Sequence, residues 1–388
     1  MQALPDTLCY LNGDYTALQD ARISVLDRGF IFGDGIYEVI PVYQGRLFRF
    51  DEHLARLTRS LAEVQIANPH TPEQWRQIAD TLIERNAGRA TGEETVYIQV
   101  SRGVAPRDHA MTQGITPTVF AMINPLKAQS AQAREQGVAC VTAEDFRWKK
   151  GHIKSTSLLS AVLARQISVE AGATETILLR DGYLTEASSS NVWVVKNGRV
   201  LGAPRDGLVL EGIRYGLIET LCQEAGIPFE LRRISEAELR NADEVLLSSA
   251  TKEVLSVTRL DGAPVGDGRP GPIYTQLYAG YQRAKLGTPP QVEPAAAATP
   301  PAAQESLIEF PSLFPIKVMG PKVDGFVETM TAIATEHDPS FEMTRVQLRD
   351  SSGGKYLSVT LTVTATSREQ LDNLYRALTA HPLAKYVL

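Results

Sequence analysis

A proline- and alanine-rich segment, residues 287–306, is the feature that most constrains how this chain can fold. It reads GTPPQVEPAAAATPPAAQES and contains no aromatic residue. A segment of this composition cannot bury enough apolar surface to offset the entropy lost on ordering, and proline-rich chains favour extended spacers. We therefore predict that it links two domains, residues 1–286 and residues 307–388. A long surface loop within one domain is the alternative.

The composition excludes several classes of protein. The 388 residues are 43% hydrophobic and 22% charged, close to the globular average, so the chain is not wholly disordered. The formal net charge of −6 provides no overall basic field, and we predict neither nucleic acid nor membrane as a partner. Cys9, Cys140 and Cys222 form no CxxC pair, so the sequence predicts neither a disulfide framework nor a metal site.

The N-terminal residues MQALPDTLCYLNGDY lack a basic region followed by an apolar run, so they do not form a secretory signal. No stretch of the chain reaches the ~18 uninterrupted apolar residues that a membrane helix needs. These two observations predict a cytoplasmic protein.

The first domain mixes strands and helices without regular alternation, which favours an α+β fold in two subdomains with a boundary near residues 120–130. Asp51 is predicted to cap the first long helix, and Ser155 or Thr156 a later one. Strands are predicted at residues 36–43, 46–50, 94–101, 117–123, 138–143, 175–180, 190–196 and 243–248, and helices at 51–64, 72–87, 156–171, 211–225 and 272–285.

The sequence contains no Walker loop, GxSxG elbow or HExxH motif, so its chemistry depends on three less specific segments. The first is GHIKSTS, in which Lys154 lies between an extended stretch and the start of a helix. A partly desolvated lysine can have a lowered pKa and act as a nucleophile toward aldehydes. Lys149 and Lys150 are nearby competitors, and a run of lysines on a solvated face is the alternative.

The second segment is LTEASSSNV, residues 184–192, which joins one acidic residue to a serine-rich turn. Serine hydroxyls and backbone N–H groups in such a turn can cradle an anion. The carboxylate of Glu186 beside it could hold a protonated ring nitrogen. An ordinary serine-rich β-turn is the alternative.

The third segment is SRGVAPRDH, residues 101–109, which gathers Arg102, Arg107 and His109 in one loop. Arg107 and His109 are two residues apart, so they point the same way in an extended chain. A guanidinium fork matches a carboxylate, and the histidine adds a donor. A basic exposed loop is the alternative.

Six segments, taken in order along the first domain, strongly resemble the D-amino acid transaminases. These are pyridoxal-phosphate (PLP) enzymes of fold type IV, the class shared with branched-chain aminotransferases and aminodeoxychorismate lyase. The resemblance implies PLP as cofactor and covers essentially all of residues 1–286. The segments are DRGFIFGDGIYEV (27–39), EHLARL (52–57), QVSRGVAPRDH (99–109), IKSTSLLSAVLA (153–164), TEASSSNV (185–192) and LEGIR (210–214).

The resemblance also implies roles for individual side chains around the cofactor. Lys154 is implied as the lysine that forms the internal aldimine with PLP, and Glu186 as the acid that pairs with the pyridine nitrogen. A helix N-terminus at residues 213–214 suits the phosphate, because its free N–H groups and dipole favour anions. Further cofactor contacts are implied for Arg56, Ser189, Ser190, Leu210, Ile213, Arg214 and Ala250.

One position departs from the resembled pattern. The family enzymes carry a hydroxyl residue where Ala250 stands. A phosphate contact there is therefore expected from the backbone alone, or from Ser249 or Thr251 instead.

The substrate trap implied by the resemblance consists of Tyr37, Arg107 and His109, which would hold the α-carboxylate. In the resembled enzymes the arginine and histidine come from the partner subunit, which implies a homodimer with composite sites. The expected reaction is ping-pong transfer between D-amino acids and 2-oxo acids, with D-alanine and 2-oxoglutarate giving pyruvate and D-glutamate. A branched-chain L-amino acid aminotransferase or an aminodeoxychorismate lyase of the same fold is the alternative, and a PLP-free binding protein is a third.

The second domain is predicted to have the element order βαββαβ of the ferredoxin-like fold. Its segments FPSLFPIKVMG and GKYLSVTLTVTATS and its C-terminal YVL resemble the YbeD-like family of small bacterial proteins. We expect a regulatory or association module, with a passive fusion as the alternative. The predicted elements are strand 313–319, helix 322–336, strands 341–349 and 355–365, helix 367–379 and strand 383–388.

Overall fold

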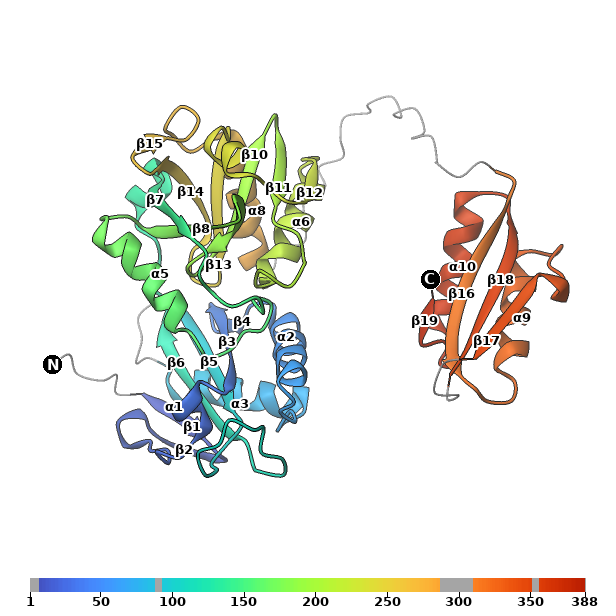
Figure 1. The fold of residues 1–388 in the computed structure, drawn as a ribbon, viewed down its shortest axis with the longest axis horizontal. Coiled ribbons are helices and arrows are strands. Elements are labelled where there is room, and N and C mark those ends of the chain that lie inside the picture. Colours follow the sequence, from blue (N-terminus) through green and yellow to red (C-terminus); the bar gives the residue numbers. More distant parts are fainter. Residues whose placement is uncertain (1–6, 88–92, 287–309, 351–355, 388) are drawn as a thin grey trace. The chain divides into compact units, whose positions relative to one another are not determined.

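The chain forms two compact units, Met1–Gln291 and Val292–Leu388 (Figure 1). The structure is a computed structural model that describes residues 7–87, 93–286, 310–350 and 356–387. The predicted linker, residues 287–306, lies outside the described residues, so its boundaries with the two domains stay predictions. None of the helices within the described ranges combines the length and apolarity needed to cross a membrane.

The first subdomain of the large unit is an antiparallel sheet covered on one face by two helices (Figure 1). Side chains of one face of β5, such as Val96, Ile98 and Val100, are fully buried against helices α2 (Phe50–Glu63) and α3 (Pro72–Arg85). The strands, in the sheet order β2-β1-β6-β5-β3-β4, are β1 (Leu8–Leu11), β2 (Asp14–Ala17), β3 (Gly35–Tyr43), β4 (Arg46–Leu47), β5 (Glu94–Ser101) and β6 (Thr118–Pro125).

The start of α2 differs from the prediction. The helix begins at Phe50, after Arg49 in the left-handed conformation, and Asp51 already lies in the first turn rather than at the N-cap. The hairpin strand β4 is short and ends at Leu47, so the chain turns into the helix one residue earlier than predicted. The Asp51 carboxylate instead accepts a hydrogen bond from Arg76 at 3.1 Å.

The second subdomain is a mixed nine-stranded sheet with a hydrophobic core on each face. Along β10, Val192 and Val194 belong to one core and Trp193 and Val195 to the other, because successive side chains of a strand point to opposite faces. The main strand order is β12-β11-β10-β13-β14-β7-β8-β9, with β15 paired to β14. The strands are β7 (Val138–Glu144), β8 (Glu175–Arg180), β9 (Tyr183–Ala187), β10 (Asn191–Lys196), β11 (Arg199–Gly202), β12 (Phe229–Leu231), β13 (Glu244–Ser249), β14 (Glu253–Leu260) and β15 (Ala263–Pro264).

The helices of this subdomain complete the two cores. Helices α6 and α8 supply Leu221 and Leu277 to the core on the Trp193 face, and α7 supplies Leu239 to the opposite one. The helices are α4 (Ala131–Gln136), α5 (Leu159–Glu170), α6 (Ile213–Glu224), α7 (Glu236–Arg240) and α8 (Pro272–Leu286).

The segment before α5 ties the two subdomains together. The predicted capping of this helix by Ser155 or Thr156 is wrong, because α5 begins only at Leu159 and has no side-chain cap. The Thr156 hydroxyl instead donates to the carbonyl oxygens of Gly33 (2.8 Å) and Gly35 (3.2 Å) in the first subdomain. Residues 153–157 therefore cross from one sheet to the other with their backbone held beside β3.

The small unit has the ferredoxin-like arrangement, and the predicted α+β class is confirmed for both units. Its antiparallel sheet has the order β17-β18-β16-β19, which places the first and third strands at the centre. The predicted strand at 341–349 is shorter, because Phe341 is buried in the core and a 3₁₀ turn at Met343–Arg345 precedes the strand. The elements are β16 (Ser312–Pro321), α9 (Phe326–His337), β17 (Val346–Asp350), β18 (Tyr356–Ala365), α10 (Arg368–Ala380) and β19 (Tyr386–Val387).

Candidate active site

A cavity of about 540 Å³ in the large unit is lined by side chains from both subdomains. This volume is in the range of small-molecule and cofactor sites. The residues predicted from the sequence that line it are Tyr37, Lys154, Glu186, Arg56, Ser189, Ser190, Leu210, Ile213, Arg214 and Ala250. The structure therefore brings together ten of the twelve predicted site residues, from segments far apart in the sequence.

Lys154 lies in the segment that crosses between the subdomains. Its carbonyl oxygen accepts a hydrogen bond from the backbone N–H of Tyr37 (3.0 Å), so the lysine backbone is anchored to β3. Its Nζ lies 4.2 Å from the centroid of the Tyr37 ring, inside the cavity. The competitors Lys149 and Lys150 are exposed. A lysine amine held in a cavity is suited to attack a carbonyl carbon or to move a proton.

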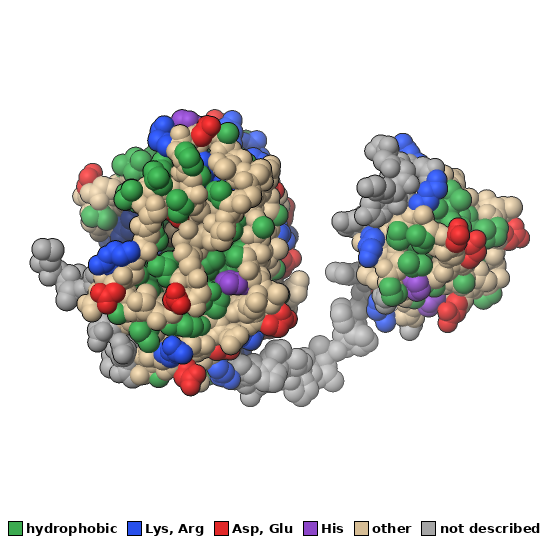
Figure 2. All heavy atoms as spheres, turned by 90° about the horizontal axis from the view of Figure 1, so that it is seen from below, with side chains coloured by type: hydrophobic (Ala, Val, Ile, Leu, Met, Phe, Trp, Pro, Cys, Tyr) green, Lys and Arg blue, Asp and Glu red, His purple; other side chains and the backbone are tan. Residues whose placement is uncertain are grey.

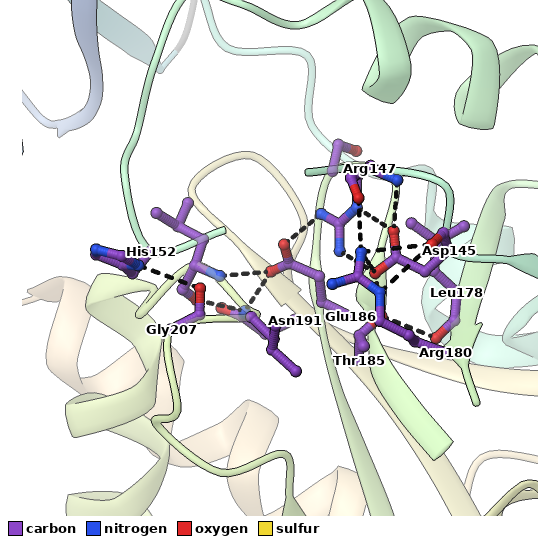
Figure 3. Close-up of polar contacts among 12 residues, drawn as sticks. Asp145, Arg147, His152, Leu178, Arg180, Thr185, Glu186, Asn191 and Gly207 are labelled. Carbon is purple, nitrogen blue, oxygen red and sulfur yellow. Dashed lines mark hydrogen bonds and ion pairs between the residues drawn. The ribbon is translucent and has the colours of Figure 1, made fainter. Parts of the chain in front are cut away.

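Glu186 is buried at the end of a chain of charged groups (Figure 3). One of its oxygens forms an ion pair with Arg147 Nη1. The other accepts hydrogen bonds from the side-chain amide of Asn191 (3.2 Å) and from the backbone N–H of Leu210 (3.1 Å). Burial raises the pKa of Glu186 above its ordinary value, and the Arg147 guanidinium opposes that rise.

Arg147 is itself fixed by a second carboxylate. Its Nε and Nη2 donate to the two oxygens of Asp145 at 2.8 and 2.9 Å, in a bidentate pair. Asp145 also accepts a hydrogen bond from Thr185 (2.8 Å). Burial raises the pKa of Asp145, but the hydrogen bonds and charge of Arg147 lower it to a value below the ordinary one. Asp145 therefore stays ionised and holds Arg147 against Glu186.

A second buried cluster fixes Arg56 on helix α2. Arg56 Nε and Nη2 each lie 2.7 Å from an oxygen of Glu38, which is fully buried. Burial raises the pKa of Glu38, but the charge of Arg56 and the hydrogen bonds lower it far below the ordinary value. His53 Nδ1 lies 2.7 Å from Glu38, and burial lowers the pKa of His53 to about 4. A neutral His53 therefore donates to Glu38 and leaves Nε2 as acceptor toward Arg214 Nη1 (3.4 Å).

Sequence reasoning did not select Asp145, Arg147, Glu38 or His53. Glu38 and His53 lie within resembled segments, and Asp145 and Arg147 are two residues apart, which places both on one side of an extended chain. No pattern in the sequence, however, shows which distant carboxylate or guanidinium each of them faces.

Unpaired donors gather where α6 begins. Within the described ranges, the buried atoms Ser190 Oγ and Arg214 Nε have no hydrogen-bond partner. The N-cap of α6 is Gly212, and a Cβ at this position would lie 2.1 Å from Asn191 Oδ1, so a larger residue would have to displace the Asn191 side chain. The first N–H groups of the helix and its dipole favour an anion at this point.

Ser189 and Ala250 differ in what they can offer to such an anion. The Ser189 hydroxyl donates to the buried carboxylate of Glu175 (2.8 Å) and accepts from Lys252 Nζ (2.9 Å). Ala250 has no polar side-chain atom, but Ser249 and Thr251 both line the cavity beside it. The hydroxyls of Ser249 and Thr251 are therefore available where Ala250 provides only backbone.

Arg107 and His109 lie on an exposed loop between β5 and β6. Of the described residues, those that line the cavity do not include these two. Arg107 and His109 instead lie against the ring of Phe32, at 5.4 Å in both cases. The structure of one chain thus leaves the predicted carboxylate trap divided between its own cavity, which holds Tyr37, and a surface loop.

The family described as Amino-transferase class IV matches residues 35–260, more than half of the chain. The chain belongs to the class IV aminotransferases. The D-alanine aminotransferase of Bacillus licheniformis is 40% identical to this class IV aminotransferase over 275 residues, which are 71% of the chain and 96% of that protein. The D-alanine aminotransferase of Staphylococcus haemolyticus is 37% identical over 278 residues, 71% and 97% of the two chains. Residues 305–388 match a family described as Protein of unknown function (DUF493).

Solved structures agree with the predicted fold. The branched-chain amino acid aminotransferase of Escherichia coli superposes on the class IV aminotransferase with a TM-score of 0.66 at 25% identity, covering 73% of this chain and 94% of that one. The branched-chain aminotransferase of the thermophilic archaeon Thermoproteus uzoniensis, with norvaline, gives a TM-score of 0.67 at 22% identity and covers 73% and 95%. Both likenesses concern the fold, and the prediction of fold type IV is confirmed.

Class IV aminotransferases use PLP, which confirms the cofactor predicted from the sequence. The residues of this cavity fit that group. The unpaired buried donors of Ser190 and Arg214 at the start of α6 suit a phosphate. The Glu186 carboxylate, with Arg147 beside it, suits a protonated ring nitrogen. Lys154 supplies an amine in the same cavity.

Proposed function

We propose that this class IV aminotransferase transfers the amino group of D-alanine to 2-oxoglutarate, producing pyruvate and D-glutamate. The observation that supports it most is the meeting in one cavity of the Lys154 amine, the Glu186 carboxylate and the unpaired donors at the start of α6. The similarity to D-alanine aminotransferases along nearly their whole length supports the choice of D-alanine.

Lys154 is the residue that acts on the substrate. Its amine would hold the cofactor and, once free, would move the proton at the substrate Cα. When bound, PLP supplies the conjugated ring that takes up the electrons of the Cα–H bond. An amine that reaches this proton from one face of the cofactor only would select one enantiomer.

The other predicted cavity residues would bind the cofactor and the substrate. Glu186, paired with Arg147, would accept a hydrogen bond from the protonated ring nitrogen. Arg56 and Ser190, with the N-terminus of α6, would bind the phosphate. Glu38 keeps Arg56 in a single orientation through its two 2.7 Å contacts. Leu210 and Tyr37 line the same cavity, where Leu210 would pack on the cofactor and Tyr37 would bind the substrate carboxylate.

The proposal is tested by a screen of D- and L-amino acids with 2-oxoglutarate as acceptor. Pyruvate formed from D-alanine is expected, with little 2-oxo acid from L-leucine. Conversion of L-leucine in preference to D-alanine would contradict the proposal and favour a branched-chain enzyme. Formation of product from aminodeoxychorismate would instead indicate a lyase.

Arg107→Leu is expected to raise KM for D-alanine by roughly tenfold or more, since a charge-assisted hydrogen bond contributes about 1.5–3 kcal/mol. The physical reason is the loss of the guanidinium that pairs with the α-carboxylate. The steady-state KM of an amine without a carboxylate, measured on the same enzyme, is the control. An equal rise in both KM values would show that Arg107 does not hold the carboxylate.

We also propose a homodimer in which the partner subunit supplies Arg107 and His109. Helix α5 supports this, because four of its apolar side chains are at least 51% exposed: Leu159, Val162, Leu163 and Val169. Figure 2 shows one face of the large unit on which hydrophobic side chains lie among mostly uncharged atoms. Large exposed apolar surfaces mark protein–protein contacts.

Leu163→Glu is expected to weaken the dimer and, with it, the activity, because burying an unpaired charge in an apolar contact costs several kcal/mol. Sedimentation velocity measures the oligomeric state. Thr220→Glu adds the same charge on the exposed surface of α6 and should leave the dimer intact. A fully active monomer of Leu163→Glu would contradict the composite site.

We place the protein in the cytoplasm. Cys9, Cys140 and Cys222 are all free and buried, and thiols persist in reducing compartments.

The substrates and products are small amino and 2-oxo acids.

A further inference from the structure

Helix α1 (Arg28–Phe32) and the loop that carries Arg107 and His109 are joined by both side-chain and backbone contacts. Helix α1 lies in the segment DRGFIFGDG, to which neither the cavity nor the proposed chemistry assigns a role. Side chains on the α1 segment contact each of the three consecutive residues 107–109. The segment therefore bears directly on how the loop is arranged.

The ring of Phe32 contacts the side chains of both Arg107 and His109. The guanidinium carbon of Arg107 lies 5.4 Å from its centroid, and the His109 ring lies 5.4 Å away at an interplanar angle of 44°. Arg107 and His109 are exposed, and an exposed arginine has a large rotamer entropy to lose when it binds a ligand. Contact with a fixed ring reduces that loss before any ligand arrives.

Arg28 fixes the backbone between these two side chains. Its guanidinium is buried, with only 3% of the residue exposed, and Nη1 donates to the carbonyl oxygen of Asp108 at 2.5 Å. The same guanidinium carbon lies 4.8 Å from the Phe32 centroid. Ring and backbone are therefore held by one buried cation.

Arg28 is in turn fixed by a buried ion cluster. Asp34 accepts from Arg28 Nε (2.8 Å) and from Arg102 Nε and Nη2 (2.8 and 3.0 Å). Burial raises the pKa of Asp34, but the hydrogen bonds from Arg102 and Arg28 lower it below the ordinary value. Arg102 Nη2 also donates to the carbonyl oxygen of Val64 at 2.7 Å, just after helix α2. The loop is thus connected through charged groups to the end of helix α2.

Backbone hydrogen bonds also hold the base of the loop that carries Arg107 and His109. The N–H of Arg28 donates to the Gly103 carbonyl oxygen (2.9 Å), and the N–H of Arg102 donates to that of Asp34 (3.0 Å). Gly103 has a φ of +109°, and a Cβ there would lie 2.1 Å from the carbonyl oxygen of Thr116. Only glycine therefore allows the chain to turn here and present the loop to α1.

We infer that Phe32 and Arg28 are positioning residues that hold Arg107 and His109 in the arrangement that binds the substrate α-carboxylate. The inference rests on the proposed function, since it assigns the loop to carboxylate binding. Neither residue touches the substrate. Each acts on affinity by removing alternative arrangements of the two side chains that do.

The test measures carboxylate binding apart from turnover. Propionate, which has the carboxylate but no amino group, is titrated into the full-length holoenzyme, and its Kd is read from the visible absorbance of the bound cofactor. Phe32→Leu and Arg28→Lys should each raise this Kd by roughly fivefold, the factor that corresponds to about 1 kcal/mol. They should raise KM for D-alanine by a similar factor with little change in kcat.

Two further variants separate positioning from general stability. Phe32→Tyr keeps the ring and should restore the Kd of the parent protein. Phe229→Leu removes another partly buried ring, which packs 5.7 Å from Trp193, and should leave the Kd unchanged. If Phe32→Leu does not fold, the propionate Kd values of Arg28→Lys and Phe32→Tyr still test the positioning role. An unchanged Kd in Arg28→Lys would overturn the inference.

Arg107→Leu distinguishes failure of this inference from failure of the proposed function. If Arg107→Leu leaves the propionate Kd unchanged, the loop does not bind the carboxylate, and the proposed trap itself is wrong. If Arg107→Leu weakens binding but Phe32→Leu does not, only the inference is wrong. In the Arg107→Leu background, Phe32→Leu should add less than fivefold, because the contact through Arg107 is already lost and only the contact with His109 remains. A full fivefold effect there would overturn the positioning role.

Discussion

Replacement of Lys154 by alanine should lower kcat for D-alanine by roughly 10⁴-fold, the upper range for removal of a group that transfers a proton in the rate-determining chemistry. Lys154 is expected to perform two tasks, covalent attachment of the cofactor and proton movement at Cα, and alanine can perform neither. The change is measured by pyruvate formation in steady state. The visible absorbance band of lysine-bound PLP should disappear at the same time.

Borohydride reduction followed by peptide mass spectrometry provides a second measurement. The parent protein should carry the reduced cofactor on the peptide that contains Lys154, and the Lys154→Ala variant should carry none. Lys149→Ala and Lys150→Ala are matched controls, since both lysines are exposed near the same segment, and they should remain labelled and active. A reduced adduct in Lys154→Ala would show that another lysine binds the cofactor.

The predicted elements agree with the structure where side-chain periodicity reports directly on a buried surface. The apolar run in β10 lies within the predicted strand 190–196, and its alternate residues belong to two separate cores. Val96, Ile98 and Val100 likewise mark the single buried face of β5. The buried face of a strand follows from the spacing of apolar residues along a short segment, and this spacing can be read from the sequence.

The start of α5 could not be predicted on the same basis. Ser155 and Thr156 are good N-cap residues by type, but Thr156 donates instead to carbonyl groups more than 120 residues earlier. A long-range partner for a hydroxyl group competes with local capping, and the local sequence does not show it. The apolar residues of α5 also gave no sign that several of them are exposed.

The candidate site also contains residues that the sequence predicts and residues that it does not. Lys154, Glu186 and Arg56 could be selected because the resemblance assigns each a role by its position in a motif. The charged groups that support them, Arg147 and Glu38, could not, because their importance depends on which carboxylate or guanidinium lies opposite. Such pairings join residues 18 and 39 positions apart and are fixed only by the fold.

Arg147→Gln is the second change for which we expect a large effect. The substitution removes the cation beside Glu186, so burial raises the pKa of this carboxyl further. Glu186 acts as the ionised form, so activity is present above its pKa and is lost as the pH falls through it. The acid limb of the kcat profile should therefore move to higher pH, and kcat at pH 7 should fall roughly tenfold for each unit of that shift once the pKa exceeds 7.

The same substitution removes the partner of Asp145, which is buried and held ionised by Arg147. Breaking a buried ion pair from one side leaves a charge without compensation, and the free energy of unfolding should fall by roughly 3 kcal/mol. Chemical denaturation of the holoenzyme measures this loss. Arg205→Gln removes an exposed guanidinium that lies 3.4 Å from Glu219 and should change neither quantity appreciably. A stability loss without any shift of the acid limb would show that Arg147 supports the fold but does not keep Glu186 ionised.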